Sequence, residues 1–186
     1  MEKNRPLRHA MEIRHPSFVT PEFIHVLRCY EIALVCADTA TPARAKSARA
    51  GEPESVSWPR LMDVTADFVY CRLHGSEQLY ASGYDGKSLD EWAARVAAWA
   101  RGSDAPGGEF ASREPAPRRA GRDVYVYFDN DAKVRAPADA EGLIERGPSA
   151  ARAAIACGEL AVARTQRIVN SALIRVELVQ GPILHS

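Results

Sequence analysis

The chain has few cysteines, no long apolar run and no excess of charge of either sign, and each absence argues against a class of protein. Its four cysteines include no CxxC pair, which argues against both a disulfide framework and a structural zinc site. The 24 basic residues balance the 24 acidic ones, so bulk charge predicts no attraction to nucleic acid or to a membrane surface. No apolar run approaches the length of a membrane span, and residues 1–16 lack the apolar core of a secretory signal. We therefore expect a cytoplasmic protein with reduced thiols.

The most informative stretch of the sequence is DFVYCRLHG, residues 67–75. Residues of a strand alternate between its two faces. Here the alternation puts small and aliphatic side chains on one face, Val69, Cys71 and Leu73. It puts an aromatic-to-charged series on the other, Phe68, Tyr70, Arg72 and His74. The sequence therefore predicts a strand that packs against helices on one face and ends in a polar pocket on the other.

Three further stretches predict strands, because 9–14 and 123–129 alternate between two faces and 32–38 is almost wholly apolar. Helices are predicted between the strands. A helix is expected to begin at Pro21 with Thr20 as its cap, and to bury the stripe Phe23, Val26, Leu27 and Tyr30. A second helix is expected from Ser88, which has Glu91 three residues later in a capping-box spacing, to Gly102. Its predicted buried stripe is Leu89, Trp92, Val96 and Trp99. A third, short helix is expected at about 137–146.

Four stretches carry weaker patterns. Residues 40–59 and 103–122 are rich in Ala, Pro, Arg or Gly without a clear period, and we expect little regular structure in either. Residues 148–166 are compatible with a helix, and 168–183 alternate weakly, as an edge strand or a disordered tail does. These patterns divide the chain into a domain at 1–147 and an extension of uncertain structure at 148–186.

The alternation of strands and helices predicts an α/β fold with a parallel sheet. Polar residues come at the C-terminal end of each predicted strand, as they do at the mouth of a barrel of parallel strands. No glycine fingerprint follows any strand, which argues against a dinucleotide site. We therefore expect a partial (β/α)8 TIM-barrel-type fold with about four parallel strand–helix units.

Five segments, in order, resemble the DUF72 family, which is also called the YecE-like family. They are EIRHPSF (12–18), ALVCADTA (33–40), DVTADFVYCRLHGSEQLYASGY (63–84), WAARVAAWARG (92–102) and DVYVYFDNDAKVRAPADA (123–140). The resemblance implies a TIM-barrel-type fold and a pocket at its mouth, but no particular reaction. It also implies that this chain corresponds to the C-terminal half of the barrel, because the match begins at about the family's fifth strand.

The predicted strand ends supply the candidate site. His74 is the predicted general acid or base, with Glu12, Asp38 or Asp129 to orient it. Arg14 and Arg72 are the predicted anion-binding pair, because a guanidinium group forks onto two oxygens of a phosphate or carboxylate. Further candidates for substrate contact are Tyr84, Tyr127 and Asn130, with Tyr80 on the same glycine-rich loop as Tyr84.

Several alternatives remain open at this point. The arginines can pair with Glu12 and Asp38 as structural salt bridges, and the four candidate acid and histidine residues can instead hold a divalent metal. Two of the carboxylates can also support glycosidase-like chemistry, which their separation decides. The leading hypothesis is an enzyme acting on a small anionic, phosphate-bearing molecule or nucleotide with no cofactor identified. The competing hypotheses are a non-catalytic binding module and an inactive fragment.

The expected partners follow from the same patterns. The basic loop 113–122 offers phosphate contacts, but the zero net charge argues against a nucleic-acid partner, and no membrane partner is expected. About four strand–helix units leave two open sheet edges and an incompletely covered core. We therefore expect either a homo-oligomer or association with a missing N-terminal half.

Overall fold

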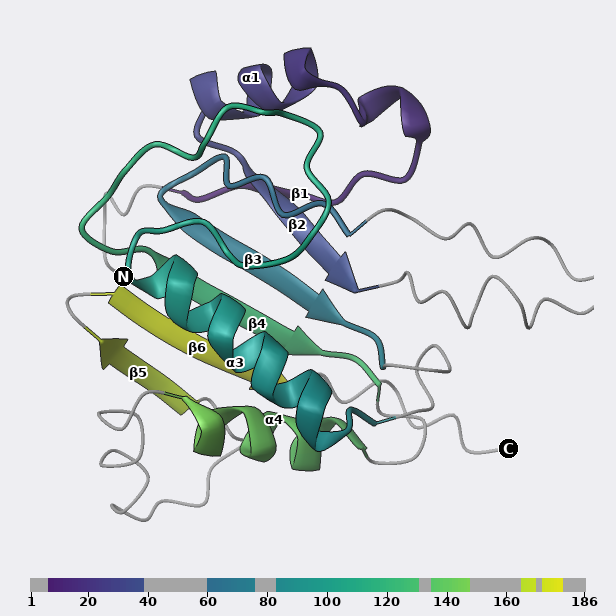
Figure 1. Ribbon diagram of the computed structural model, residues 1–186, viewed down its shortest axis with the longest axis vertical. Helices are drawn as coiled ribbons and strands as arrows, with labels where there is room; N and C mark the ends of the chain where they lie inside the picture. Colours follow the sequence, from purple (N-terminus) through teal and green to yellow (C-terminus); the bar gives the residue numbers. More distant parts are fainter. Residues whose placement is uncertain are drawn as a thin grey trace, which may run out of the picture.

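The computed structural model describes residues 7–38, 60–75, 83–130, 135–147, 165–169 and 172–178. The predicted loop at 40–59, Tyr80 and most of the segment 148–166 lie outside these ranges. The described strands are β1 (Ala10–Met11), β2 (Ala33–Asp38), β3 (Phe68–Leu73), β4 (Asp123–Phe128), β5 (Thr165–Val169) and β6 (Ala172–Leu178). They form one sheet in the order β1-β2-β3-β4-β6-β5 (Figure 1).

The sheet is parallel from β1 through β4 to β6, and only β5 runs antiparallel, beside β6. The predicted α/β class is therefore confirmed. The described strands form an open sheet with β1 and β5 at its edges, so a closed barrel is not seen in this part of the chain. Two details differ from prediction. The first strand is shorter than 9–14, and the weak pattern near 168–183 gives two strands, of which β6 lies inside the sheet.

Three α-helices and a 3-10 helix are described: η1 (Pro16–Phe18), α1 (Pro21–Cys29), α3 (Gly86–Ala100) and α4 (Arg135–Arg146). Thr20 caps α1 as predicted, its hydroxyl accepting the Phe23 N–H at 3.2 Å. The predicted start of α3 is wrong, because Asp85 rather than Ser88 is its cap and accepts the Ser88 N–H. No helix among the described residues is both long and apolar enough to cross a lipid bilayer.

Gly102 ends α3 as the sequence suggested, and the structure shows why glycine stands there. Its φ of +79° is a left-handed conformation that side chains disfavour. A Cβ at this position would also meet the backbone carbonyl of Arg119. The close approach packs the loop 101–122 against the end of the helix, and this loop contains no helix or strand, as predicted.

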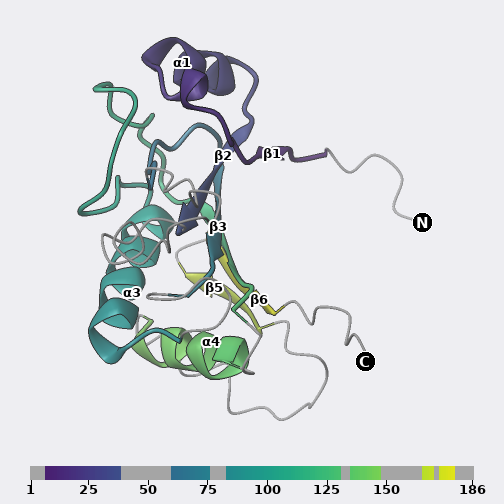
Figure 2. The ribbon, with the colours of Figure 1, turned by 90° about the vertical axis from the view of Figure 1, so that its right-hand side faces the viewer.

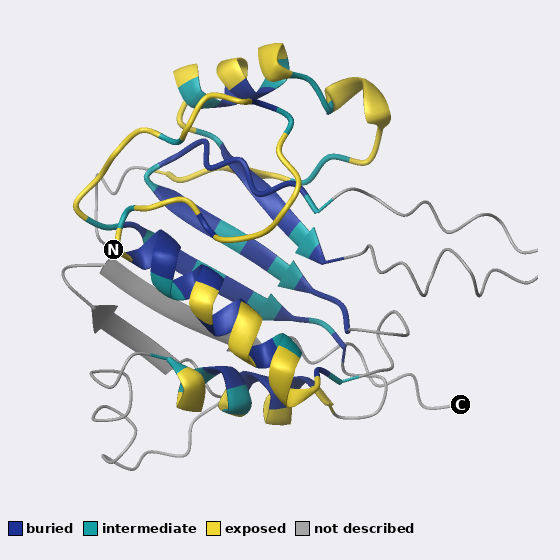
Figure 3. Cartoon of the chain, viewed as in Figure 1, coloured by how far each residue is buried: buried dark blue, intermediate teal, exposed yellow. Residues whose placement is uncertain are grey.

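The helices pack on one face of the sheet, where the main core lies (Figures 1 and 2). The alternating hydrophobes of β3 and β4 pack there against Trp92 and Trp99 of α3, both fully buried. Figure 3 shows the burial concentrated along the central strands and the facing sides of the helices. The predicted buried stripe of α3 is confirmed, because Leu89, Trp92, Val96 and Trp99 are all buried.

The stripe predicted for α1 is only partly correct. Ile24 and Leu27 are buried against Leu34 of β2, whereas Val26 is 47% exposed and Tyr30 is 74% exposed. Helix α1 lies at the β1–β2 edge of the sheet (Figure 1). A helix at the edge of a layer has fewer neighbours than one at its centre, so a narrower part of its surface is covered.

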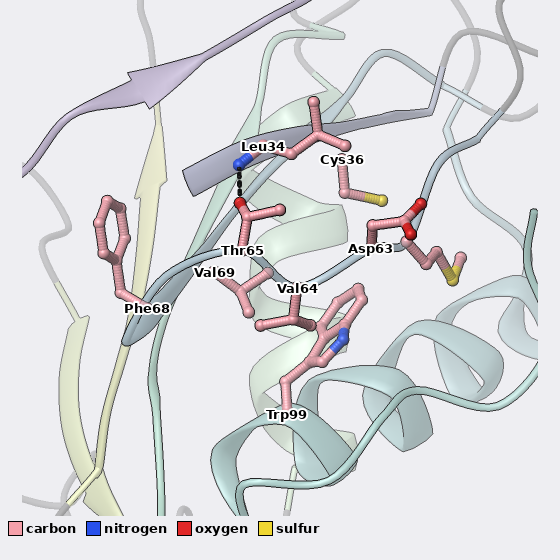
Figure 4. Close-up of a pocket in the computed structure, with 9 residues that line it drawn as sticks. Leu34, Cys36, Asp63, Val64, Thr65, Phe68, Val69 and Trp99 are labelled. Atoms are coloured by element: carbon pink, nitrogen blue, oxygen red, sulfur yellow. Dashed lines mark hydrogen bonds between the residues drawn. The ribbon is translucent and has the colours of Figure 1, made fainter. Parts of the chain in front are cut away.

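A small cavity lies inside the core between β2, the segment 61–65 and α3 (Figure 4). Beside the cavity, the side chain of Thr65 forms hydrogen bonds with the backbone at the start of β2, before its pairing with β3 begins at Val35. Its hydroxyl donates to the Ile32 carbonyl at 2.6 Å and accepts the Leu34 N–H at 2.8 Å. The cavity volume of 10 Å³ is about what one water molecule requires, so this space holds no ligand.

The opposite face of the sheet is covered by no helix among the described residues (Figure 2). It carries the second side-chain series of β3 and β4, Phe68, Tyr70, Arg72, Tyr125 and Tyr127. Next to β3, strand β2 places Val35 and Ala37 on this face, in register with Tyr70 and Arg72, and Ala33 packs there beside Phe68. We call this side of the sheet the open face.

Candidate functional site

A cluster of opposite charges lies on the open face where the parallel strands end. Arg72, near the end of β3, bridges two carboxylates from other segments. Its Nη1 donates to Oε2 of Glu12 at 2.5 Å and its Nη2 donates to Oδ2 of Asp129 at 2.6 Å. Glu12 follows β1 and Asp129 follows β4, so one guanidinium group connects segments that are 57 and 60 residues away in the sequence.

Arg14 completes the cluster from its outer side. Its Nη2 forms an ion pair with Oε1 of Glu12, while the Arg14 side chain remains 53% exposed. The Arg72 side chain is less accessible, at 29%. Burial lowers the pKa of Arg72, but the hydrogen bonds and charges of Glu12 and Asp129 outweigh this effect and raise the pKa above its ordinary value. Both arginines therefore carry a full positive charge at every physiological pH.

His74 lies behind this cluster and is fully buried. Its Nε2 is 3.3 Å from Oδ2 of Asp129, the same oxygen that accepts from Arg72. Burial lowers the pKa of His74 below 6.5, the charge of Asp129 opposes this effect, and the charge of Arg72 adds to it. The imidazole is therefore neutral at pH 7. Because His74 is fully buried behind Asp129, it would act on a ligand only indirectly, through that carboxylate.

Asp38 lies on the other side of the sheet, and the prediction that it shares a face with His74 is wrong. It pairs in register with Leu73, whose side chain belongs to the helix-covered core. The hydroxyl of Tyr84 donates to Oδ2 of Asp38 at 2.9 Å, and the Tyr84 oxygen accepts the Gly75 N–H at 3.0 Å. Oδ1 of Asp38 is 3.2 Å from Nε of Arg60. Strand parity alone already grouped Asp38 with Leu34 and Cys36.

Asn130 and Tyr84 belong to the same buried network on the helix-covered side. The Asn130 amide donates to Oδ2 of Asp139 at 2.7 Å, and the Tyr84 N–H donates to both oxygens of that carboxylate at 3.2 Å. Burial raises the pKa of the Asp139 carboxyl, and the two donors partly offset this effect. The network connects the segments after β3 and β4 to α4. The described hydrogen bonds of these side chains are therefore made to other parts of the protein and have a structural role.

Tyr127, the remaining predicted contact, lies on the open face. Its ring stacks on that of Tyr70, with centroids 6.1 Å apart and planes at 29°. Arg72 and Tyr127 are register partners on neighbouring strands, so Tyr127 lies beside the charge cluster. Of the nine predicted site residues, six therefore gather at this end of the open face, Glu12, Arg14, Arg72, His74, Tyr127 and Asp129. The other three, Asp38, Tyr84 and Asn130, gather on the opposite side.

Sequence reasoning missed a second cluster at the other end of the open face. Arg8 donates to Asp123 at 2.5 Å, to Asp67 at 3.3 Å and to the Tyr125 hydroxyl at 3.2 Å. Its guanidinium also lies 5.2 Å above the ring of Phe68. Asp67 directly precedes β3 and Asp123 is the first residue of the neighbouring strand β4. Two carboxylates at the same end of adjacent strands were the available signal for a basic partner.

Asp63 was also missed. Its two oxygens accept the backbone N–H groups of Ala111 and Ser112 at 2.8 and 3.0 Å, which anchors the loop 101–122. It precedes no strand directly and belongs to no spacing motif, so no pattern in the sequence marked it.

The described residues give no support to the alternative of a metal site. No three His, Cys, Asp or Glu side chains in the described ranges gather as a set of metal ligands, and Asp38 lies apart from the other predicted ligands. Cys36 and Cys71 are buried and free. Burial raises the pKa of the Cys71 thiol well above its usual value, which makes it a poor nucleophile.

Comparison with known proteins agrees with the pattern seen in the sequence. The family model described as "Protein of unknown function DUF72" matches residues 2–157, which is well over half of the chain. No curated protein and no solved structure matches the chain. The chain belongs to the DUF72 family.

Proposed function

We propose that this DUF72 protein binds a small anionic molecule on the open face, at the charge cluster of Glu12, Arg14, Arg72 and Asp129. The observation that carries the proposal is the arrangement of two permanently charged arginines at the ends of parallel strands. Strand ends are where ligands bind in α/β proteins. Arg14 is half exposed and supplies the accessible positive group, while Arg72 is held in place by its two carboxylates.

The charge of the cluster determines how an anion binds there. The two arginines and two carboxylates cancel, and His74 is neutral at pH 7. An incoming phosphate or carboxylate group adds negative charge, which favours the protonated form of His74. We therefore expect proton uptake on binding, with tighter binding as the pH falls toward 6.

A catalytic role is the second candidate, and the contact of His74 with Asp129 favours it. In this case the partly exposed Asp129 would accept or donate the substrate proton, and His74 would adjust its basicity from behind. His74 would then be a positioning residue. Its substitution would shift the pH profile of turnover as well as its rate.

The test is isothermal titration calorimetry of the full chain with inorganic phosphate and methyl phosphate, in two buffers of different ionisation enthalpy. We expect saturable binding, an apparent enthalpy that depends on the buffer, and at least tenfold weaker binding by Arg14→Gln. The last figure corresponds to one lost charge-assisted hydrogen bond of about 1.5–3 kcal/mol.

Arg101→Gln is the matched control, because Arg101 is exposed at the end of α3 on the helix-covered side. It removes the same charge and is expected to leave the affinity unchanged. Equal weakening by both variants would show that only net charge matters and would refute a defined site. Proton uptake that persists in His74→Gln would refute the role given to His74.

A further inference from the structure

The tyrosines of the open face form a row of stacked rings that leads to the charge cluster. Tyr125 stacks on Tyr70 with centroids 6.4 Å apart and planes at 23°, and Tyr70 stacks on Tyr127 at 6.1 Å and 29°. Near-parallel planes at these distances are the geometry of offset aromatic stacking. Successive rings come from alternate strands, β4, β3 and β4, so the row follows the strand direction.

The two ends of this row differ. At the N-terminal end of the strands, the ring of Phe68 meets Tyr125 edge-on at 5.8 Å. Arg8 lies over Phe68 and donates to the Tyr125 hydroxyl. That end is therefore occupied by the protein itself. At the C-terminal end the last ring is Tyr127, which is half-buried and lies in register with Arg72.

The neighbouring strand β2 presents small side chains beside the row. In register with Arg72, β2 presents Ala37, and in register with Tyr70 it presents Val35. On this side of the row the large side chains therefore belong to β3 and to Glu12 after β1, which Arg72 reaches, whereas on the other side β6 places Arg175 and Glu177 in register with Tyr125 and Tyr127. A flat ring placed against Tyr127 would continue the stack and would bring an attached anionic group to Arg72 and Arg14.

We infer that the ligand of this site is a flat-ring phosphate, a molecule that carries both a phosphate group and a planar ring, and that this ring stacks on Tyr127. The inference rests on the proposed function, because the phosphate end requires the charge cluster. Mononucleotides and simple aryl phosphates share this chemistry. Tyr127 would supply the preference for a ring, and Arg14 and Arg72 would supply the preference for negative charge.

The test compares phosphates that differ only in the ring. Phenyl phosphate and methyl phosphate form one pair, and adenosine 5′-monophosphate and ribose 5-phosphate form the other. Stacking on one aromatic side chain corresponds to a preference of roughly 5- to 150-fold. We expect that preference for phenyl phosphate in the wild-type chain, and we expect it to disappear in Tyr127→Ala while the affinity for methyl phosphate is unchanged.

Tyr30→Ala is the matched control, because Tyr30 is exposed on the opposite side of the protein at the end of α1. It should retain the full preference. If Tyr127→Ala does not fold, the wild-type chain still decides the matter by NMR. Stacked phenyl protons of the bound ligand shift upfield, and unshifted protons would contradict the inference.

Each outcome has a defined meaning. A ring preference in both pairs supports the inference with a nucleotide as the ligand, and a preference in the phenyl pair alone supports it with a simple aryl phosphate. Equal affinities within both pairs overturn it, while the binding of phosphate itself stands. If no phosphate of either pair binds, the proposed function fails and the inference fails with it.

Discussion

Replacing Arg72 by glutamine tests the central feature of the site, the bridge between Glu12 and Asp129. The substitution removes two charge-assisted hydrogen bonds, of 2.5 and 2.6 Å. It also leaves two mostly buried carboxylates, 18% and 12% exposed, near each other without the shared cation. Each such bond contributes about 1.5–3 kcal/mol, and breaking a buried pair typically costs about 3–5 kcal/mol. Because Arg72 is itself 29% exposed, we take the lower end, a loss of about 3 kcal/mol.

The assay is equilibrium unfolding in urea at pH 7. With a denaturant slope of about 1–3 kcal/mol per molar, this loss lowers the midpoint by roughly 1–3 M. Arg72→Lys should lose part of this amount, because one ammonium group does not fork onto two carboxylates as a guanidinium does.

The double variant Arg72→Gln/Asp129→Asn separates a specific bridge from a general loss of packing. If the bridge is as described, the double variant loses clearly less stability than the sum of the two single variants, because the unmatched carboxylate has been removed. Strict additivity, together with a loss below about 1 kcal/mol for Arg72→Gln, would mean that these are ordinary surface ion pairs. The reasoning about the cluster would then be refuted.

Three further predictions concern other parts of the chain. Because the pKa of His74 is lowered in the folded protein, the unfolded chain binds more protons below about pH 6.5. The free energy of unfolding should therefore fall as the pH decreases from 6.5, and His74→Gln should reduce this dependence on pH. The charged groups that act on the imidazole are Asp129, Arg72, Glu12 and Arg14. Tyr84→Phe removes the buried hydroxyl that donates to Asp38 and accepts the Gly75 N–H, and should lose about 1–3 kcal/mol in urea unfolding, whereas Tyr30→Phe should lose nothing. Asp63→Ala frees the loop 101–122 and should speed trypsin cleavage after its arginines about tenfold or more, and a rate equal to that of Asp104→Ala would contradict its anchoring role.

The sequence was most informative where local periodicity decides the structure. Strict alternation in 68–73 and 123–128 determines which side chains meet the helices, because a strand has only two faces. Thr20 followed by Pro21 determines the start of α1, because a cap acts on the N–H groups of its own first turn. The same local rules placed Arg72 and Asp129 at strand ends and identified them as candidates for one site.

Only the tertiary structure decided which candidates share a pocket. Asp38 and Asn130 carry suitable groups at strand ends, and Tyr84 carries one just before α3. Their partners, however, are Arg60, Asp139 and Gly75, and these contacts depend on how distant loops pack. Arg8 meets Asp67 and Asp123 across 59 and 115 residues, a distance over which no periodicity extends. Local patterns are determined by neighbours in the chain, whereas a site requires segments to meet in space, and that depends on the packing of the whole sheet.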